Sequence, residues 1–398
     1  MIKPQTLKGF RDFLPSESKK RQYVITALKK VFESFGFDPL ETPTLEYDEV
    51  LSGKYGEEGE KLMYRFEDNG GRKVAMRYDQ TVPLARVIAQ YSNDLPMPFK
   101  RYQIQPVFRA ENTQKGRYRE FIQCDIDIIG LDSAATDAEI IAVTIKSYEN
   151  LGFKNFKVLV NDRSVFGDLP TKAIIIIDKL KKIGAEKVKE ELSAKGFDPD
   201  VLSKIQNATL PDRLKLAIKV AGKMGIDKEK IVFEPTLARG LDYYTGTIIE
   251  VESPDYPTGS LGGGGRYDNL IGMFMDKKMP AVGFSFGFDR TIEAMEELKL
   301  FPQNLQTTKA LVTIFSLELA DKSMEICNML RSNNINAEIY LDVKTKMEKQ
   351  LKYADQKNIP YAVLLGPKEI EKNVVTIKNM KTREQKEIKI DQLTKELI

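Results

Sequence analysis

Several arginines stand where their guanidinium groups could bind an anion. Arg109 closes one alternating stretch, and Arg117 leaves a polar, glycine-containing loop that ends shortly before Phe121. A guanidinium group can contact two phosphate oxygens at once, and an aromatic ring beside it offers a stacking surface. A lone arginine is more often part of a surface ion pair, so only the group as a whole favours a phosphate ligand.

The stretch after this loop alternates between apolar and polar side chains. Positions 122, 124, 126 and 128 are Ile or Cys, while the other face carries Phe121, Gln123, Asp125 and Asp127. Residues two apart on a strand lie roughly 7 Å apart, so a ligand could span that face, with Glu111 of the loop as a further acceptor. A solvated sheet surface shows the same alternation, and both interpretations stay open here.

Three later segments could complete such a site. Residues 237–246 place Arg239 beside a glycine and before Tyr243 and Tyr244, although spacing alone favours a turn followed by a strand. Residues 262–265 are four glycines, which let backbone amides approach a ligand, but alone they predict a flexible loop or bulge. Residues 281–290 predict a strand entering a helix whose first turn holds Arg290, a favourable place for phosphate. Asp289 and Arg290 could equally be a capping and surface pair.

Composition excludes several kinds of chemistry. The chain contains no histidine, which excludes Ser-His-Asp triads, Cys-His pairs and histidine-ligated metals. Its two cysteines, Cys124 and Cys327, can build neither a disulfide framework nor a zinc site, and they suit a reducing cytoplasm. We predict no protein-ligated metal site. Catalysis must therefore depend on carboxylates, arginines, lysines, hydroxyls and backbone amides.

These residues need a scaffold, and 398 residues are too many for one ordinary core, so we expect two or three domains. Helical spacing predicts a helix over residues 16–35 that stops at Gly36, and a second helix with Thr81 as its N-cap. Residues 103–109 and 121–130 predict a long antiparallel hairpin. Residues 162–231 predict an inserted helical module, and a strand follows over residues 247–252.

The last part of the chain has a different pattern. Residues 301–308 read as a linker, after which strands over 310–315, 338–341 and 361–365 alternate with helices over 319–331 and 346–357. This order predicts a small parallel α/β domain. The residues from Lys309 onward hold 16 Lys or Arg and 13 Asp or Glu, which equals the whole net charge of +3 and hints at a polyanionic partner. No apolar run is long enough to cross a membrane, and no secretory signal is visible.

Together and in this order, the segments resemble those of class II aminoacyl-tRNA synthetases. Residues 108–121 look like motif 2 and residues 283–290 like motif 3, while residues 16–43 stand where motif 1 builds a dimer interface. Residues 237–244 and 260–267 resemble two signatures specific to the histidyl-tRNA synthetase family. Residues 76–81 and 123–127 look more like its eukaryotic and archaeal branch, in which Asp79 replaces a bacterial glutamate. The resemblance covers the whole chain.

The resemblance implies an α+β fold with two domains. Residues 1–308 would form a catalytic core on an antiparallel sheet, with the helical insertion at about 162–231, and residues 309–398 an α/β anticodon-binding domain. The implied activity converts histidine and ATP to histidyl-adenylate and pyrophosphate, and then moves histidine to the 3′ end of tRNA(His). The family also implies Mg²⁺ with the ATP, a homodimer, the cytoplasm, and no membrane partner.

The resemblance also implies roles for individual residues. Arg109 and Arg239 would be the catalytic cations beside the α-phosphate and the histidine carboxylate. The other residues implied for histidine binding are Asp79, Thr81 and Gln123 around its amino group, Asp127, Tyr243 and Tyr244 around its imidazole, and Gln80. Those implied for ATP are Arg109, Glu111 at the adenine amino group, Phe121 stacked on the ring, and Arg117 and Arg290 at the γ-phosphate.

Two other functions are compatible with such a core. A catalytically silent paralogue serves as the regulatory subunit of ATP phosphoribosyltransferase, and a synthetase-like domain can act as a sensor of uncharged tRNA. Arg239 in the first histidine signature and the C-terminal α/β segment both argue against the regulatory subunit. No kinase-like sequence is attached, which argues against the sensor.

Overall fold

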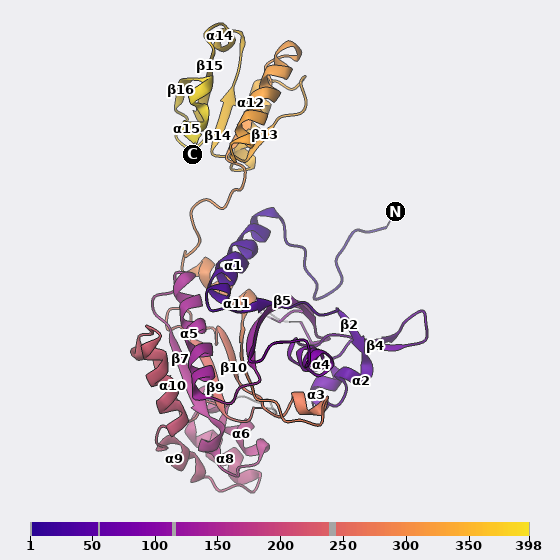
Figure 1. Cartoon of the computed structure of the whole chain (residues 1–398), viewed down its shortest axis with the longest axis vertical. Coiled ribbons are helices and arrows are strands. Elements are labelled where there is room, and N and C mark those ends of the chain that lie inside the picture. The colour runs from indigo at the N-terminus through magenta and orange to yellow at the C-terminus, as the bar shows by residue number, and fades with distance from the viewer. Residues whose placement is uncertain (1, 55, 114–116, 239–243, 398) are drawn as a thin grey trace. The chain divides into compact units, whose positions relative to one another are not determined.

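The structure is a computed structural model that describes residues 2–54, 56–113, 117–238 and 244–397 (Figure 1). The chain divides into two compact units, residues 1–301 and 302–398. The division falls at the start of the stretch predicted as a linker. None of the helices in the described part is both long and apolar enough to cross a membrane.

An eight-stranded sheet forms the centre of the first unit. Its spatial order is β1-β5-β6-β11-β10-β9-β7-β8, in which β1–β5 and β7–β8 are parallel and all other neighbours antiparallel. This arrangement confirms the predicted antiparallel core. The strands are β1 Asp38–Pro39, β5 Phe99–Phe108, β6 Glu120–Ile129, β7 Lys157–Asp162, β8 Ile231–Phe233, β9 Thr247–Glu252, β10 Gly262–Arg266 and β11 Ala281–Phe286.

The predicted hairpin is the pair β5 and β6, which joins Val107 to Phe121 and Gln103 to Asp125 in register. Both strands begin earlier than the sequence predicted. The polar face of β6 is not a solvated surface, because Asp125 and Asp127 are both buried. The alternation of side chains therefore separates two covered faces, one apolar and one polar.

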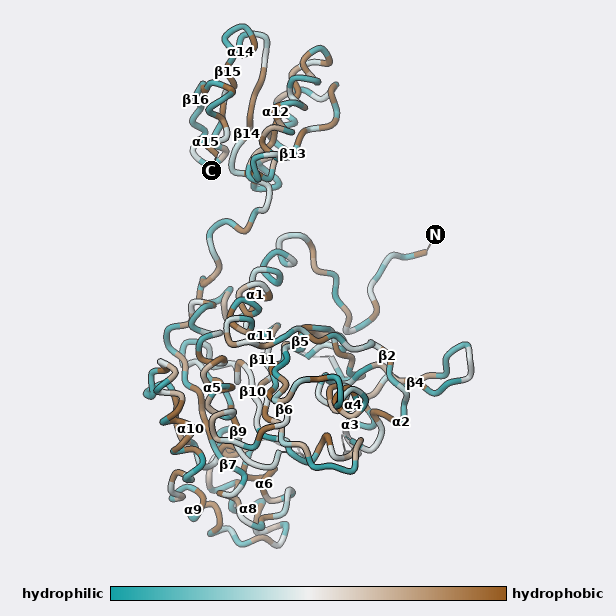
Figure 2. The backbone as a smooth tube through the Cα atoms, viewed as in Figure 1, coloured by the Kyte–Doolittle hydropathy of each residue, from teal (hydrophilic) through white to brown (hydrophobic). Residues whose placement is uncertain are grey.

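Three helices cover the apolar face of this sheet (Figure 1): α1 Pro15–Ser34, α5 Ala134–Asn150 and α11 Phe288–Glu297. The helix predicted over residues 16–35 is α1, and it stops before Gly36, whose φ of +74° favours glycine. Val24, Leu28 and Phe32 of α1 pack into the same core as Ile126 and Phe284 of the sheet. Figure 2 shows the hydrophobic residues of these strands and helices.

Helix α4, Thr81–Tyr91, lies at the other side of the hairpin. Thr81 was predicted as its N-cap, which is wrong: Gln80 occupies that position, and the Asp79 carboxylate accepts a hydrogen bond from the Val82 amide at 3.1 Å. Asp79 thus satisfies the amide that a Thr81 cap would have left open. Nearby lie helices α2 Asp48–Leu51 and α3 Gly56–Lys61 and a small sheet of β2 Leu45–Tyr47, β4 Lys73–Met76 and β3 Arg65–Glu67.

The predicted helical insertion consists of two parts. Helices α6, α8 and α9 build a separate core with Leu159 of β7 and Ile248 of β9. Helix α10 packs instead on α5, through Leu214, Ala217 and Ala221. The elements of the insertion are η1 Arg163–Phe166, α6 Thr171–Ile177, α7 Leu180–Ile183, α8 Ala185–Ala194, α9 Val201–Gln206, α10 Asp212–Lys223 and η2 Lys228–Lys230.

The glycine run is not the flexible loop or bulge that its composition predicted. It forms β10, an inner strand whose five residues are all buried between β9 and β11. A Cβ atom on Gly264 would lie 2.6 Å from Cα of Phe284 and closer still to the Gly283 carbonyl oxygen. Glycine is required here because neighbouring backbone occupies the space of a side chain.

The second unit contains a five-stranded sheet in the order β13-β12-β14-β15-β16. Its first three strands are parallel and confirm the predicted α/β pattern, with α12 Ala320–Ser332 and α13 Met347–Gln356 between them. The antiparallel β15 and β16 were not predicted. The strands are β12 Ala310–Val312, β13 Ala337–Ile339, β14 Tyr361–Leu364, β15 Val374–Asn379 and β16 Gln385–Lys389, with η4 Leu317–Leu319, α14 Pro367–Glu371, η5 Ile390–Gln392 and α15 Leu393–Leu397 around them; η3 Ile271–Met273 belongs to the first unit.

Candidate active site

The register of the large sheet gathers polar residues on one face. Asp125 of β6 stands opposite Gln103 of β5 and Ser285 of β11. One step further along, Asp127 stands opposite Arg101 and Gly283. Because successive partners alternate between faces, Phe121, Gln123, Asp125 and Asp127 share one face across this part of the sheet.

Asp127, predicted to bind imidazole, is held by two partners. Its Oδ2 forms an ion pair with Arg101 at 2.7 Å, and its Oδ1 accepts a hydrogen bond from the Tyr267 hydroxyl. Burial raises the pKa of Asp127, while the Arg101 charge and the Tyr267 hydrogen bond lower it. Gly283 leaves room for this carboxylate, since a Cβ there would overlap Oδ1. Arg101 and Tyr267 thus fix the orientation of Asp127 before any ligand arrives.

Asp125 was placed on this face by the sequence but was given no role. Its carboxyl is buried, and Oδ1 has no hydrogen-bond partner within the described residues. Burial raises the pKa of Asp125 to about 7, Arg101 opposes the rise, and the charges of Asp127 and Asp79 add to it. This excess of carboxylates over guanidinium groups favours a cationic ligand such as an ammonium group.

The residues predicted around the amino group come from β6 and the start of α4. The Gln80 side chain is fully buried and donates to the backbone carbonyls of Gln105 at 3.0 Å and Gln123 at 3.2 Å. Gln80 therefore joins α4 to the hairpin. Gln123 and Thr81 are half-buried, and Oε1 of Gln123 has no hydrogen-bond partner in the part of the chain described. Asp79 caps α4, as described above.

The predicted phosphate and adenine residues gather at the far end of the hairpin. Arg109 donates from Nε to the Tyr78 carbonyl at 3.2 Å, and its guanidinium lies 4.4 Å from the Tyr78 ring centre and 5.1 Å from that of Phe121. The structure thus brings Arg109 and Phe121 together, as predicted for a cation beside a stacking ring. Glu111 pairs with Arg117 at 3.8 Å, and the Arg117 side chain is 65% exposed.

Arg290 lies in the first turn of α11 and is exposed. Its guanidinium donates to the Ser260 carbonyl at 2.7 Å. Asp289 does not pair with its neighbour; it forms ion pairs with Arg21 at 2.6 Å and Arg11 at 3.1 Å. Sequence reasoning missed Arg11, because nothing in the spacing joins residues so far apart along the chain.

Arg239 and Tyr243 lie outside the described residues, so their predicted roles stay predictions. The chain on both sides of this segment is anchored to the sheet. Asn161 of β7 donates to the Leu237 carbonyl at 2.9 Å, and the Thr245 amide donates to the Arg266 carbonyl at 2.8 Å. Tyr244 is half-buried, and its ring lies against Gly265, where a Cβ would be 3.0 Å from a ring carbon.

A buried network of charged residues anchors the end of β10 through Arg266. Arg266 donates to Asp137 of α5 at 2.7 Å, to the Thr136 hydroxyl at 2.9 Å and to Asp268 at 3.1 Å. Asp137 also accepts from Arg213 of α10 at 2.6 Å. Each buried charge has a partner of opposite sign, so this network connects the insertion to the sheet and needs no ligand.

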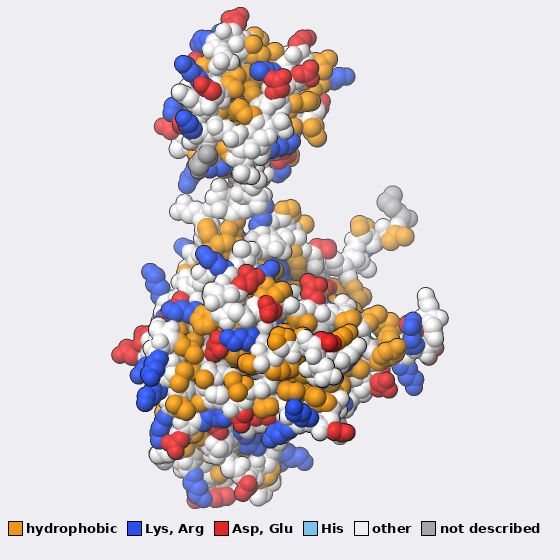
Figure 3. Space-filling view, in the orientation of Figure 1, with side chains coloured by type: hydrophobic (Ala, Val, Ile, Leu, Met, Phe, Trp, Pro, Cys, Tyr) orange, Lys and Arg blue, Asp and Glu red, His pale blue; other side chains and the backbone are white. Residues whose placement is uncertain are grey.

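The polar face can thus bind a molecule with a cationic end and an anionic end. Carboxylates surround one end of it, and Arg109 with Phe121 lies at the other. Among the described residues, no group of three or more Asp, Glu or Cys side chains could hold a metal ion. On the face drawn in Figure 3, positive and negative side chains are interspersed, and no single sign dominates.

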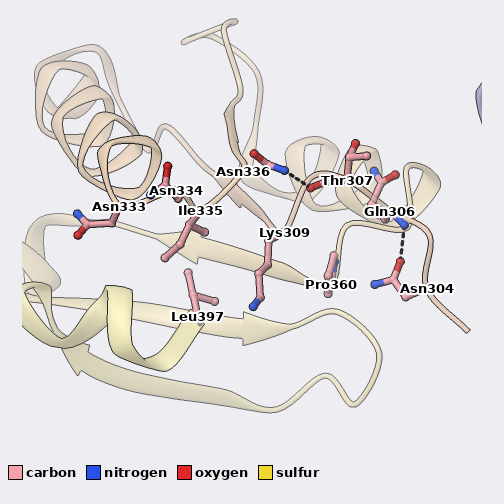
Figure 4. Close-up of a pocket in the computed structure, with 10 residues that line it drawn as sticks. All are labelled: Asn304, Gln306, Thr307, Lys309, Asn333, Asn334, Ile335, Asn336, Pro360 and Leu397. Atoms are coloured by element: carbon pink, nitrogen blue, oxygen red, sulfur yellow. Dashed lines mark hydrogen bonds between the residues drawn. The ribbon is translucent and has the colours of Figure 1, made fainter. Parts of the chain in front are cut away.

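A separate cavity of about 480 Å³ lies in the second unit (Figure 4). It is at the amino ends of β12, β13 and β14, and several of its amides are already bonded, as in the Asn336 bond to the Thr307 carbonyl at 3.0 Å. None of the described residues that were predicted for chemistry lines it. Its walls are Asn304, Gln306, Thr307, Lys309, Asn333, Asn334, Ile335, Asn336, Pro360 and Leu397.

Two family models match most of this chain. The one described as histidyl-tRNA synthetase matches residues 9–198 and 198–291, and the one described as anticodon binding domain matches residues 309–398. A protein of Cytophaga hutchinsonii named histidine--tRNA ligase is 39% identical over 454 residues, covering 100% of both chains.

Solved structures are similar over the same length. A crystal structure of histidyl-tRNA synthetase from Nostoc sp. PCC 7120 has a TM-score of 0.89 at 30% identity and covers 100% of this chain and 99% of its own. A structure from Bacillus halodurans C, described as an ATP phosphoribosyltransferase regulatory subunit/histidyl-tRNA synthetase, has a TM-score of 0.75 and covers 92% and 99%. At 22% identity, that second likeness shows a shared fold alone.

Proposed function

Since the chain belongs to the histidyl-tRNA synthetase family, we propose how its residues perform the function of a histidine--tRNA ligase. Histidine and ATP are first converted to histidyl-adenylate and pyrophosphate, and histidine then passes to the 3′ end of tRNA(His). The observation that carries the proposal is that β6 presents an aromatic residue and a series of polar residues on one face. Phe121 and Asp127 are roughly 20 Å apart along the strand, enough for an amino acid joined to a nucleotide.

Histidine binds at the carboxylate-rich end. Its ammonium group is positioned by Asp79, Thr81 and Gln123, with Gln80 holding the start of α4 against the hairpin. Its imidazole lies between Asp127 and the tyrosines at positions 243 and 244. Because Arg101 and Tyr267 already orient Asp127, its carboxylate is an acceptor in a fixed position, and an amino acid that lacks a matching N–H group would lose this hydrogen bond.

ATP binds at the arginine-rich end. Phe121 stacks on the adenine, Glu111 accepts a hydrogen bond from its amino group, and Arg117 and Arg290 bind the γ-phosphate. Glu111 lies 3.8 Å from Arg117, so in this proposal the two residues contact opposite ends of the nucleotide in place of each other.

The first step requires alignment and charge neutralisation more than proton transfer. An oxygen of the histidine carboxylate forms a bond to the α-phosphorus as the bond to the β-phosphate oxygen breaks and pyrophosphate leaves. Arg109 and Arg239 stabilise the negative charge that develops on the α-phosphate. The attacking carboxylate is already ionised, so a chain without histidine loses no catalytic group.

Mg²⁺ accompanies the ATP. Since the described residues contain no cluster of three acidic or cysteine ligands, phosphate oxygens and water would supply most of its coordination. When bound, the ion neutralises charge on the phosphates that leave as pyrophosphate.

The second unit, which matches the anticodon-binding model, binds tRNA. Phe315 and Leu341 lie just beyond the carboxyl ends of β12 and β13 and are 57% and 80% exposed. An unpaired base can stack on the Phe315 ring and pack against Leu341, and lysines that follow, such as Lys344 and Lys346, can contact phosphate. We place the domain boundary after Thr308 and the protein in the cytoplasm.

The active form is a homodimer. Leu45, Tyr47 and Phe66 share one face of the small sheet, because Leu45 pairs with Met76 and both Tyr47 and Phe66 pair with Val74. These three side chains are 44%, 54% and 47% exposed. Apolar side chains gathered on one strand face favour cover by a second copy, and sedimentation at a single-chain mass would contradict it.

The experiment that tests this function is amino-acid-dependent ATP–pyrophosphate exchange, run with each of the twenty amino acids. We expect exchange with histidine alone. Arg239→Ala should slow histidine-dependent exchange by about a hundredfold or more, since it removes a cation from the reacting phosphate, while tRNA binding is retained. Wild-type exchange in this variant would remove Arg239 from the catalytic residues.

Absence of exchange with any amino acid, from a folded protein, would instead favour the silent regulatory subunit or the uncharged-tRNA sensor. The relatives named as ligases and the match of residues 309–398 to an anticodon-binding domain argue for the enzyme.

A further inference from the structure

The N-terminal segment of residues 7–13 lies against the loop that joins β5 to β6. The Arg119 amide donates to the Gly9 carbonyl at 2.9 Å, and Arg119 Nε donates to the Glu111 carbonyl at 3.1 Å. Gly9 has a φ of +89°, and a Cβ on it would lie 2.7 Å from the Arg119 side chain. Only glycine meets both conditions, so the segment has a defined place on the loop.

Arg11 of this segment touches two elements of the proposed ATP site at once. Its guanidinium carbon lies 3.2 Å from the ring centre of Tyr118, and its Nη2 donates a hydrogen bond to Oδ1 of Asp289 at 3.1 Å. Tyr118 directly follows Arg117, and Asp289 directly precedes Arg290. A single side chain therefore contacts the immediate neighbours of both arginines assigned to the γ-phosphate.

These contacts lie in a partly protected environment, with the Arg11 and Asp289 side chains 25% and 22% exposed. Asp289 has a second cationic partner, Arg21 of α1, at 2.6 Å. Loss of Arg11 would therefore not leave the Asp289 charge uncompensated. What Arg11 adds is a connection between Tyr118 and α11.

We propose that Arg11 is a positioning residue for ATP, which holds the loop of Arg117 and the first turn of Arg290 at a fixed separation. The inference rests on the proposed function of these two arginines. Arg117 has little other support, since its side chain is 65% exposed and its pair with Glu111 is 3.8 Å long. Without Arg11, ATP must itself order the loop, which lowers affinity for ATP.

The histidine end has separate supports. Asp127 is fixed by Arg101 of β5 and by Tyr267, which directly follows β10, and not by residues of the N-terminal segment. Loss of Arg11 should therefore weaken ATP binding selectively, whereas general damage to the fold would affect both substrates.

The test is Arg11→Gln, with steady-state exchange measured against ATP at saturating histidine and against histidine at saturating ATP. We expect the KM for ATP to rise about tenfold, the scale of a lost hydrogen bond to a charged group. The KM for histidine and the thermal unfolding midpoint should stay close to those of the unmodified chain. Equilibrium dialysis with labelled ATP measures the same loss without any turnover.

Three further variants separate positioning from folding. Arg11→Lys keeps the charge beside Asp289 but not the flat contact with Tyr118, so its KM for ATP should be intermediate. Lys20→Gln removes a 2.6 Å ion pair between α1 and Glu296 of α11 and should change neither KM. In a double variant with Tyr118→Leu, the effects on the KM for ATP should not add, because both changes break one contact.

An unchanged affinity for ATP in Arg11→Gln would overturn the proposal. So would a parallel rise in both KM values together with a lower unfolding midpoint, because Arg11 would then act only on the fold. If the unmodified chain shows no histidine-dependent exchange, the proposed function fails, and the dialysis of ATP still decides the role of Arg11.

Discussion

The Asp125 carboxyl is buried on the polar face of β6, close enough to Asp79 and Asp127 to feel their charges. One buried guanidinium group, that of Arg101, offsets these charges only in part. The site therefore has an excess of negative charge, which a cationic ligand would neutralise. This arrangement suits the ammonium group of an amino acid, and it makes the stability of the fold around Asp125 sensitive to pH.

Asp125→Asn should reveal this sensitivity. Burial raises the pKa of Asp125 to about 7, whereas an aspartate in an unfolded chain titrates near 3.9. Between roughly pH 4 and pH 7 the folded state holds the extra proton, so this group's contribution to stability falls as pH rises through that window. At pH 8 the asparagine variant should be more stable, with a free energy of unfolding higher than that of the unmodified chain by on the order of 2 kcal/mol.

Denaturant unfolding at pH 5 and pH 8 measures the effect. The advantage of the variant should be smaller at pH 5, where the folded carboxyl is already protonated. Asp276→Asn, a change at an exposed aspartate, serves as the control and should behave alike at both pH values. A loss of stability of equal size at both pH values in Asp125→Asn would contradict the burial argument.

For individual residues, the sequence predicted the position of the site better than it predicted the contacts within the site. Motif spacing predicted Arg109 beside Phe121 and Asp127 on a polar strand face. It did not predict that Arg101 and Tyr267 would already hold Asp127, because these partners come from β5 and from the residue after β10, and their approach depends on the register of the sheet. Tyr267 does end one of the histidine-specific signatures, which was the only available signal.

Among the elements, β10 shows most clearly how the site acquires its shape. A strand of glycines has no side chains on either face, so the Tyr244 ring can lie directly against Gly265. The strand has no side chains to specify its register before Arg266. Its position depends instead on β9 and β11, and on the buried contacts of Arg266 with α5.

Gly264→Ala should therefore destabilise the first unit. The new methyl group would lie 2.6 Å from the Phe284 Cα and closer still to the Gly283 carbonyl, and backbone cannot move aside as a flexible side chain can. We expect a loss of about 1–3 kcal/mol in the free energy of unfolding, measured with denaturant. Gly272→Ala is the matched control, because the nearest atom to its new methyl group, the Lys277 carbonyl oxygen, would be 3.6 Å away.

Equal stability of the two alanine variants would show that β10 can separate from β11 at little cost. A loss of stability below about 1 kcal/mol together with lower exchange activity would indicate that β11 is displaced. Such a displacement would move Gly283 away from Asp127.

Elements with a strong period were predictable from sequence, and those defined by partners were not. Helix α1 and the hairpin follow directly from the spacing of their apolar residues. Composition predicted a loop or bulge where β10 lies. The loop propensity of glycine is overridden there because β9 and β11 form hydrogen bonds with β10 on both sides. Strand β16 was missed because charged residues occupy three of its five positions, and four of its five residues are exposed. Strand β15 has a β-favouring sequence but pairs with β14 and β16 only through a turn that the sequence did not specify.

The whole molecule consists of two units with separate hydrophobic cores. The core of the second unit includes Val312, Leu330 and Val363, while the candidate site uses residues of the first unit only. Histidine activation and anticodon binding are thus assigned to parts of the chain that each bury their own apolar surface.

A chain that ends at Thr308 should retain histidine-dependent exchange near that of the full chain. Ending there keeps Phe301, whose ring packs against Tyr23 of α1 at 5.9 Å. Aminoacylation of tRNA should fall about a hundredfold in kcat/KM, because a ligand held at two sites loses avidity when one is removed. Equal aminoacylation by both chains would show that the second unit contributes nothing to tRNA binding.

The contact between Arg11 and Asp289 joins residues 278 positions apart. During synthesis at 5–20 residues per second, Arg11 must wait roughly 14–56 s before Asp289 is even made. A nascent chain therefore grows through most of the first unit without this support of its proposed ATP site. Since the chain also contains no histidine, making a new copy draws nothing from the supply of histidyl-tRNA that the copy will later replenish.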